Sequence, residues 1–210
     1  MTPGPSGMPF GRVLRGRVAE RILTTLLERG GFRVTRFGIE ELFDEVKYLD
    51  LTEYLQLGLS KALRALPDLL VADTQVSWAA LVEVKYRRTF TSKIARELHA
   101  TLSEQRQHWP EAYAAIIIGD PFVEDGHFHQ DYIRLVEPGK TDALLWRPPE
   151  NAERTDRETM QAVWNRLPTI LKLFRPAHFD SDTEEADRRG REFLDACDYV
   201  TAAIKELQHF

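Results

Sequence analysis

The feature that most constrains the fold is the stretch of residues 67–85, in which two short apolar runs flank a polar segment. The runs cover residues 69–72 and 79–84, and neither contains glycine or proline. The segment between them, residues 73–77, has the composition of a turn. Two aliphatic and β-branched runs joined in this way predict a β-hairpin.

Charged side chains stand where this hairpin should be buried. Asp68 precedes the first run, and Glu83 and Lys85 lie two residues apart in the second. Because side chains alternate across a strand, Glu83 and Lys85 share one face, and Val82 and Val84 share the other. If Asp68 lies opposite Glu83, a bound divalent cation is the simplest way to offset their repulsion. The alternative is a hairpin without a metal, in which the acids pair with the lysine and nearby arginines.

The spacing of these residues resembles a known motif. Pro67-Asp68, a spacer of fourteen residues and Glu83-Val84-Lys85 resemble the PD-(D/E)XK nuclease superfamily, over roughly residues 12–119. The resemblance implies an α/β restriction-endonuclease-like core, a mixed sheet built in the order α-β-β-β-α-β and flanked by helices. It also implies that Asp68, Glu83 and the backbone carbonyl of Val84 bind Mg²⁺, for which Mn²⁺ would substitute. Lys85 would orient or deprotonate the attacking water and stabilise the developing negative charge.

The sequence on both sides of the hairpin has the periodicities that this core requires. Apolar residues recur at helical spacing up to Gly30-Gly31, a pair typical of a helix end. Thr91-Ser92 offers an N-cap, and a fully apolar run follows the helix that it opens. The predicted elements are a helix over residues 12–29, a strand over 32–37, a helix over 93–108 and a strand over 112–119.

The remaining segments are predicted to elaborate a single domain, residues 11–210. Residues 40–66 would form one or two helices, about 40–47 and 51–66, inserted between the first strand and the hairpin. This insertion would shape substrate access or a dimer contact; a helical lid that only completes the core is the alternative. A C-terminal elaboration over residues 120–210 is expected to contain strands at 131–136 and 143–147 and helices at 156–167 and 188–207.

Two further site residues come from the resemblance. Many superfamily members have an acid on the first helix that reaches the metal, and Glu20 is the matching candidate for catalysis and metal binding. The alternative is that Glu20 pairs with Arg17 or Arg21 on its own helix. Some members use a glutamine on the second helix, and Gln105 is the candidate; a solvent-exposed glutamine is the alternative.

The net charge of −5 is distributed unevenly along the chain. Residues 1–39 carry seven Arg against two Glu, and residues 85–108 carry six basic against two acidic residues. The segment between them, residues 40–84, carries three basic and nine acidic residues. Basic segments on both sides of an acidic motif suit a phosphate backbone held around a metal, although arginines on solvated helix faces are the alternative. The predicted phosphate contacts are Arg87, Arg88, Lys93 and Arg96.

Composition limits the other classes. No apolar stretch approaches the roughly 20 residues of a membrane helix, so no membrane association is expected. The single cysteine, Cys197, excludes an internal disulfide, fits a reducing cytoplasm and is expected to be a buried structural thiol. Residues 1–10 are rich in proline and glycine and lack an apolar signal core, which predicts a disordered leader. No P-loop motif is present, so ATP use is not expected.

Together these observations predict a metal-dependent phosphodiesterase, a DNA endonuclease of the restriction, repair or anti-phage defence type. Two alternatives stay open: a nucleic-acid-binding or scaffold subunit without turnover, and a nuclease that is active only within a larger complex. A homodimer or a partner protein is expected to bind through the helices after residue 150.

Overall fold

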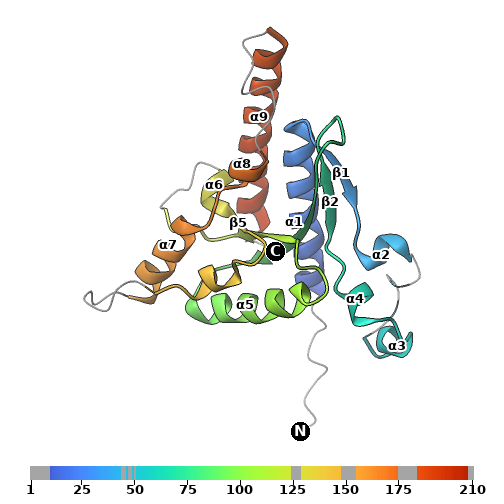
Figure 1. The fold of residues 1–210 in the computed structure, drawn as a ribbon. Coiled ribbons are helices and arrows are strands. Elements are labelled where there is room, and N and C mark those ends of the chain that lie inside the picture. The colour runs from blue at the N-terminus through green and yellow to red at the C-terminus, as the bar shows by residue number, and fades with distance from the viewer. Residues whose placement is uncertain are drawn as a thin grey trace.

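A five-stranded mixed sheet forms the centre of the computed structural model, which describes residues 10–43, 46, 49, 51–123, 129–147, 155–174 and 184–207 (Figure 1). The strand order in space is the order in sequence, β1 to β5. Strands β3 and β4 are parallel, and the other neighbours are antiparallel. The strands are β1 (Arg33–Arg36), β2 (Leu69–Ala72), β3 (Ala79–Arg87), β4 (Tyr113–Ile118) and β5 (Ile133–Val136).

Helices cover both faces of the sheet (Figure 1). One core cluster packs Val82 and Val84 against apolar side chains of α1 (Phe10–Arg29) and α9 (Glu184–Glu206). A second cluster packs Ala114 and Ile116 against α5 (Ser92–Arg106), the 3₁₀ helix η2 (Thr141–Leu145) and α7 (Asp156–Arg166). The predicted α/β class, with a mixed sheet between layers of helices, is therefore confirmed. Two short helices, α6 (His129–Tyr132) and α8 (Ile170–Leu173), flank β5 in the chain.

The parallel pair β3 and β4 requires a crossover, and α5 supplies it. The helix begins after Thr91, whose Oγ1 accepts a hydrogen bond from the backbone N–H of Ile94 at 3.3 Å, as the Thr91-Ser92 pair predicts. Strand β4 then lies between β3 and β5 with five of its six residues buried. The predicted strand over residues 112–119 is therefore confirmed. Its continuous apolar run is what an interior strand covered on both faces requires.

Helix α1 ends at the glycine pair that predicts its end. Gly31 has φ +85°, a left-handed conformation that costs glycine least. The N–H of Gly31 donates to the carbonyl of Glu28, and the N–H of Phe32 donates to that of Leu27, both at 3.0 Å. These two bonds form a Schellman motif, which stops the helix and turns the chain into β1.

The insertion is more broken than the sequence predicts. Its described parts are three short helices, α2 (Ile39–Leu42), α3 (Leu51–Gln56) and α4 (Lys61–Arg64), where two longer ones are predicted. Gly58, at φ +65°, separates α3 from α4, and the hydroxyl of Ser60 caps α4. Residues 44, 45 and 47 of the first predicted helix lie outside the described residues, as do residues 48 and 50 between the two predicted helices.

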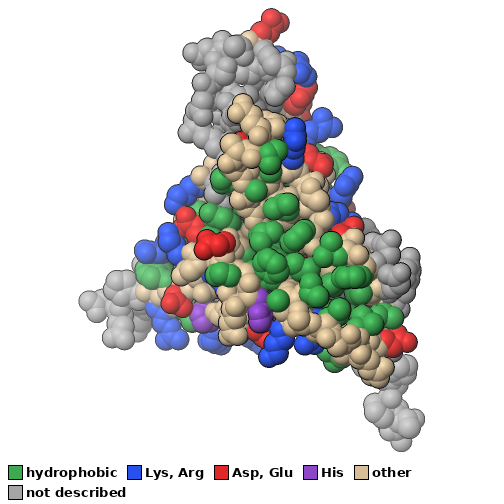
Figure 2. Space-filling view, turned by 45° about the vertical axis from the view of Figure 1, so that its right-hand side comes forward, with side chains coloured by type: hydrophobic (Ala, Val, Ile, Leu, Met, Phe, Trp, Pro, Cys, Tyr) green, Lys and Arg blue, Asp and Glu red, His purple; other side chains and the backbone are tan. Residues whose placement is uncertain are grey.

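Several large apolar side chains of the insertion remain on the surface. Figure 2, which turns the side with α2 to α4 forward, shows a broad gathering of hydrophobic side chains on this face. The insertion residues that are about half-exposed are Leu42, Phe43, Leu55 and Leu57. Part of the insertion therefore contributes to the surface and not to the core.

Several further boundaries differ from the prediction: β5 begins at Ile133 and not at residue 131, and α9 begins at Glu184 and not at residue 188. The predicted strand over residues 143–147 is wrong: its first residues belong to η2, and Leu144 packs into the core beside α5. The outer edge of β5 is occupied instead by the chain around Pro168, whose carbonyl accepts a hydrogen bond from the N–H of Leu135 at 2.9 Å. Helix α1 begins at Phe10, the last residue of the predicted leader; residues 1–9 lie outside the described residues.

Of the helices in the described ranges, none combines the length and the apolar character needed to cross a membrane. The lone thiol of Cys197 is buried on α9, as predicted, and burial raises its pKa to about 12. It is therefore a structural thiol at neutral pH.

Candidate active site

The hairpin brings Asp68 beside β3. Antiparallel pairing of Leu69 with Val82 sets the register and carries Asp68, one residue before β2, to the level of Glu83. Its Oδ2 accepts a hydrogen bond of 2.6 Å from the backbone N–H of Val84. On the opposite side, its backbone carbonyl accepts a hydrogen bond of 2.8 Å from Phe37, next to β1. Asp68 is thus fixed from both neighbouring strands.

Glu83 lies on the same face of β3 as Lys85, as strand alternation predicts, and the two side chains form an ion pair. The carboxylate of Glu83 is buried, with its other oxygen accepting a hydrogen bond of 2.5 Å from Nε2 of Gln105. The same amide nitrogen donates to the carbonyl of Ala65 at 3.2 Å. Gln105 is therefore buried at the site and not solvent-exposed, and it connects α5, the insertion and β3.

The buried charges perturb one another. Burial, followed by the nearby charge of Glu83, raises the pKa of Asp68 well above its ordinary value of 3.8, against the opposing effect of Lys85. Burial alone would lower the pKa of Lys85, but the charges of Glu83 and Asp68 outweigh it and leave that pKa raised. Lys85 is therefore an ammonium at neutral pH, and its charge is shared by two carboxylates, those of Glu83 and Asp68.

Glu20 reaches the same region from α1. Its partner is Arg36, at the end of β1, at 3.4 Å, and Arg36 also contacts Glu41 at 3.0 Å. The alternative partners on its own helix, Arg17 and Arg21, form no ion pair with it. Burial raises the pKa of Glu20 against the opposing charge of Arg36, and Glu83 adds to the rise.

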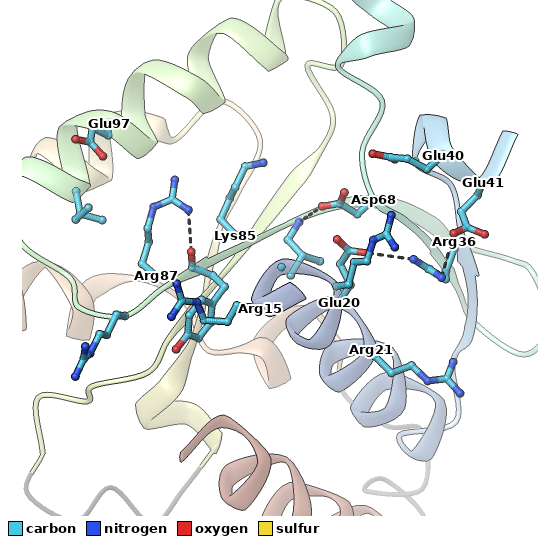
Figure 3. Close-up of a pocket in the computed structure, with 17 residues that line it drawn as sticks. Arg15, Glu20, Arg21, Arg36, Glu40, Glu41, Asp68, Lys85, Arg87 and Glu97 are labelled. Atoms are coloured by element: carbon cyan, nitrogen blue, oxygen red, sulfur yellow. Dashed lines mark hydrogen bonds and ion pairs between the residues drawn. The ribbon is translucent and has the colours of Figure 1, made fainter. Parts of the chain in front are cut away.

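A cavity of about 910 Å³ lies at this end of the sheet, beside these side chains (Figure 3). Asp68, Val84 and Lys85 lie on its wall together with Glu20, whereas Glu83 and Gln105 stand behind Lys85 and are not in the lining. The lining residues are Arg15, Gly16, Arg17, Glu20, Arg21, Arg36, Gly38, Glu40, Glu41, Asp68, Val84, Lys85, Tyr86, Arg87, Arg88, Ile94 and Glu97.

The predicted phosphate contacts divide into two groups. Arg87 and Arg88 line the cavity. Lys93 and Arg96 do not: they lie exposed on α5, and Lys93 approaches Glu97 at 4.0 Å. Each residue of α5 is rotated about 100° from the one before it, so residues three apart share a face. Ile94 and Glu97 share the face toward the cavity, whereas Lys93 and Arg96 lie on other faces of the helix.

Four arginines of the lining were not predicted as site residues. They are Arg15, Arg17, Arg21 and Arg36. The excess of arginine over acid in residues 1–39 is the signal for them in the sequence. That signal identifies a basic segment, but helix and strand geometry decides which of its arginines face the cavity.

The donor set is compatible with a hard divalent cation. Carboxylates and a backbone carbonyl are the ligands that Mg²⁺ prefers. A cation would relieve the repulsion from Glu83, which adds to the effect of burial in raising the pKa of Asp68. Among the described residues, no three His, Cys, Asp or Glu side chains are grouped as a ready-made metal site. Binding of a cation by Glu83 would compete with the ion pair to Lys85.

Comparison with family models, curated proteins and solved structures finds no match to this chain.

Proposed function

We propose that this protein is a metal-dependent nuclease of the PD-(D/E)XK type, with a restriction-endonuclease-like core, that hydrolyses phosphodiester bonds in DNA. The observation that carries the proposal is the convergence of Asp68, Glu83 and Lys85 at one end of the hairpin, beside a cavity lined by arginines. The chain order α1, β1, β2, β3, α5, β4 supports the fold assignment. The activity would fit restriction, repair or anti-phage defence equally well.

Asp68, Glu83 and the carbonyl oxygen of Val84 would hold Mg²⁺, with Glu20 as a further candidate ligand. When bound, the cation supplies a Lewis acid for the phosphate and lowers the pKa of an attacking water. Mn²⁺ would substitute because it accepts the same oxygen ligands.

Lys85 would act by charge. Its raised pKa keeps it protonated, so its ammonium group would stabilise negative charge that develops on the scissile phosphate and would not serve as the base in the metal-free protein. Gln105 would act through Glu83, since its amide fixes one oxygen of that carboxylate. Arg87 and Arg88 would contact neighbouring phosphates.

The test is cleavage of plasmid DNA, single-stranded DNA and RNA in the presence and absence of Mg²⁺ or Mn²⁺. We expect Asp68→Ala, Glu83→Ala and Lys85→Ala each to lower the cleavage rate by about a hundredfold to a thousandfold. Glu104→Ala, an exposed acid on α5 outside the cavity, is the matched control and should cleave normally. Cleavage that persists in all three folded site variants would refute the assignment.

A second candidate is a nucleic-acid-binding or scaffold subunit that performs no chemistry. The observation in its favour is that Glu83 and Glu20 already have cationic partners, in Lys85 and Arg36. This candidate predicts DNA binding that is indifferent to divalent metal, with no product on any of the three substrates.

A further inference from the structure

The cavity carries more positive charge than its own acids neutralise. Seven cationic and five acidic side chains line it. Arg36 is neutralised by Glu20 and Glu41, and Lys85 by Glu83. Four of the remaining arginines form no ion pair with any described residue: Arg15, Arg17, Arg21 and Arg88.

Two of these arginines, Arg15 and Arg21, stand on opposite sides of the acids (Figure 3). Figure 3 shows Arg15 and Arg87 on one side of Asp68 and Glu20, and Arg21 on the other. Across the sheet, the order of the strands gives the same sequence of residues as Figure 3. Arg36 lies at the end of β1, Asp68 lies just before β2, and Lys85 lies on β3, and these three strands are neighbours in the sheet.

The four arginines can be assigned to two pairs, one near Tyr86 and one on α1. Arg15 and Arg88 both lie close enough to the Tyr86 hydroxyl to oppose the rise in its pKa that burial causes. Arg17 lies one helical turn before Arg21 and therefore on the same side of α1. The result is one pair of unneutralised guanidinium groups on each side of the carboxylates.

Like charges gathered on a concave wall repel one another and raise the local potential for anions. A single phosphate group would neutralise only one of the two pairs. A phosphodiester chain that crosses the cavity presents successive phosphates to both pairs and places the phosphate between them at Asp68 and Lys85. Guanidinium groups suit this task because they bind phosphate oxygens through two parallel donors.

We propose that Arg15 with Arg88, and Arg17 with Arg21, are two phosphate-binding subsites of one nucleic-acid track, which enters on one side of the carboxylates and leaves on the other. The identity of the ligand rests on the proposed function. The track replaces α5 as the main phosphate-binding surface, because the exposed cations Lys93 and Arg96 lie outside the cavity.

The test compares three double variants that each remove two positive charges: Arg15→Ala with Arg88→Ala, Arg17→Ala with Arg21→Ala, and the control Lys93→Ala with Arg96→Ala. Binding of a fluorescein-labelled DNA duplex, and of the corresponding single strand, is measured by anisotropy at several NaCl concentrations. All samples contain EDTA, so that no cleavage occurs, and circular dichroism confirms that each variant is folded.

We expect each cavity double variant to bind more weakly and to reduce the slope of log K against log salt concentration. The reduction should be about 1.8 for a duplex or about 1.4 for a single strand, since each lost contact lowers the slope by about 0.9 or 0.7 respectively. The α5 control should keep the wild-type slope, and a nucleoside monophosphate should not compete with the labelled chain at equal phosphate concentration.

The inference is overturned if the control variant loses as much slope as the cavity variants, because bulk charge would then explain binding. It is also overturned if only one cavity pair matters, if the mononucleotide competes equally, or if the wild type does not bind. Its failure can be distinguished from that of the proposed function. Cleavage that needs Asp68 but is unaffected by the arginine variants removes only the track, and binding along the track without cleavage in any metal removes only the nuclease.

Discussion

At the scale of single residues, the carboxylates of Asp68 and Glu83 share one ammonium group, that of Lys85, although the cavity as a whole has more cationic than acidic side chains. Asp68 is buried beside Glu83, and its pKa is raised even though Lys85 is close. Burying a carboxylate without full compensation costs free energy, so this residue opposes folding of the metal-free protein at neutral pH. Residues that oppose folding in this way are typical of functional sites.

A direct prediction concerns Asp68→Asn, which keeps a side-chain oxygen for the N–H of Val84 but removes the charge. The pKa of Asp68 is higher in the folded chain than in the unfolded chain, where it is near 3.8. Such a carboxyl stabilises the folded state at a pH below 3.8, and this stabilisation is lost as the pH rises through the folded-state pKa. We therefore expect Asp68→Asn to raise the melting temperature in EDTA at neutral pH and to weaken this loss of stability with rising pH.

Mg²⁺ reverses the comparison. The cation should stabilise the wild type and leave Asp68→Asn unchanged, because only the charged form supplies a strong ligand. Thermal unfolding between about pH 4 and pH 8, with and without Mg²⁺, measures both effects. A lower melting temperature for Asp68→Asn in EDTA at neutral pH would contradict the assigned charge balance.

Gln105 offers a second prediction at this scale. Gln105→Leu removes the hydrogen bonds to Glu83 and to Ala65 and leaves a buried carboxylate oxygen without its partner. We expect a loss of about 1–3 kcal/mol in the free energy of unfolding. Activity at limiting Mg²⁺ should fall by about ten- to a hundredfold, with partial recovery at high Mg²⁺.

Gln107→Leu is the matched control, because Gln107 is exposed at the end of α5. Urea unfolding and a Mg²⁺ titration of the cleavage rate separate the structural effect from the effect on the metal. An equal response of the two variants would show that Gln105 has no positioning role.

At the scale of elements, α1 is the helix on which the cavity most depends. It carries Glu20 and three of the lining arginines, and its end is fixed by Gly31. Within the helix, a Cβ at Gly16 would meet no atom within 4 Å. The two glycines therefore have opposite structural roles in one helix.

The corresponding substitutions should change stability in opposite directions. Gly31→Ala places a side chain at φ +85° and should lower the free energy of unfolding by about 1 kcal/mol. Gly16→Ala should raise it by about 0.5–1 kcal/mol, because alanine favours the helix and open space receives its methyl group. Urea unfolding measures both, and effects of equal sign would refute the assigned roles.

At the scale of the whole molecule, the site depends on a helix that contributes none of its chemistry. Helix α9 packs against α1 over the same face of the sheet, with Val200 and Ile204 fully buried between the layers (Figure 1). This packing holds α1, and hence Glu20, against β3. The C-terminal segment is thus part of the core that supports the site.

Ile204→Ala should therefore lower the free energy of unfolding by about 2–5 kcal/mol through the cavity that it leaves. Leu194→Ala, on the exposed side of the same helix, should change it by less than about 0.5 kcal/mol. Denaturant unfolding tests both variants. Equal effects would mean that the assigned faces of α9 are wrong.

The elements that could be predicted from the sequence are those with local signals. The hairpin, α1, α5 and β4 are each marked by a periodicity, a cap or a glycine pair within a few residues of one another. The shared face of Glu83 and Lys85 follows in the same way from strand alternation. Short-range geometry is sufficient for these features, since it depends only on neighbours along the chain.

The remaining features depend on contacts between residues far apart in the sequence. Gln105 meets Glu83 from 22 residues away, Glu20 pairs with Arg36, and the arginines of α1 face the end of β3. The edge of β5 is covered by the chain near Pro168, which follows β5 by more than 30 residues, and residues 143–145 lie in a 3₁₀ helix instead. The sequence alone thus predicts the motif and its sheet. Which side chains line the cavity depends on how the helices are rotated when they pack on the sheet, and no pattern of neighbouring residues determines that rotation.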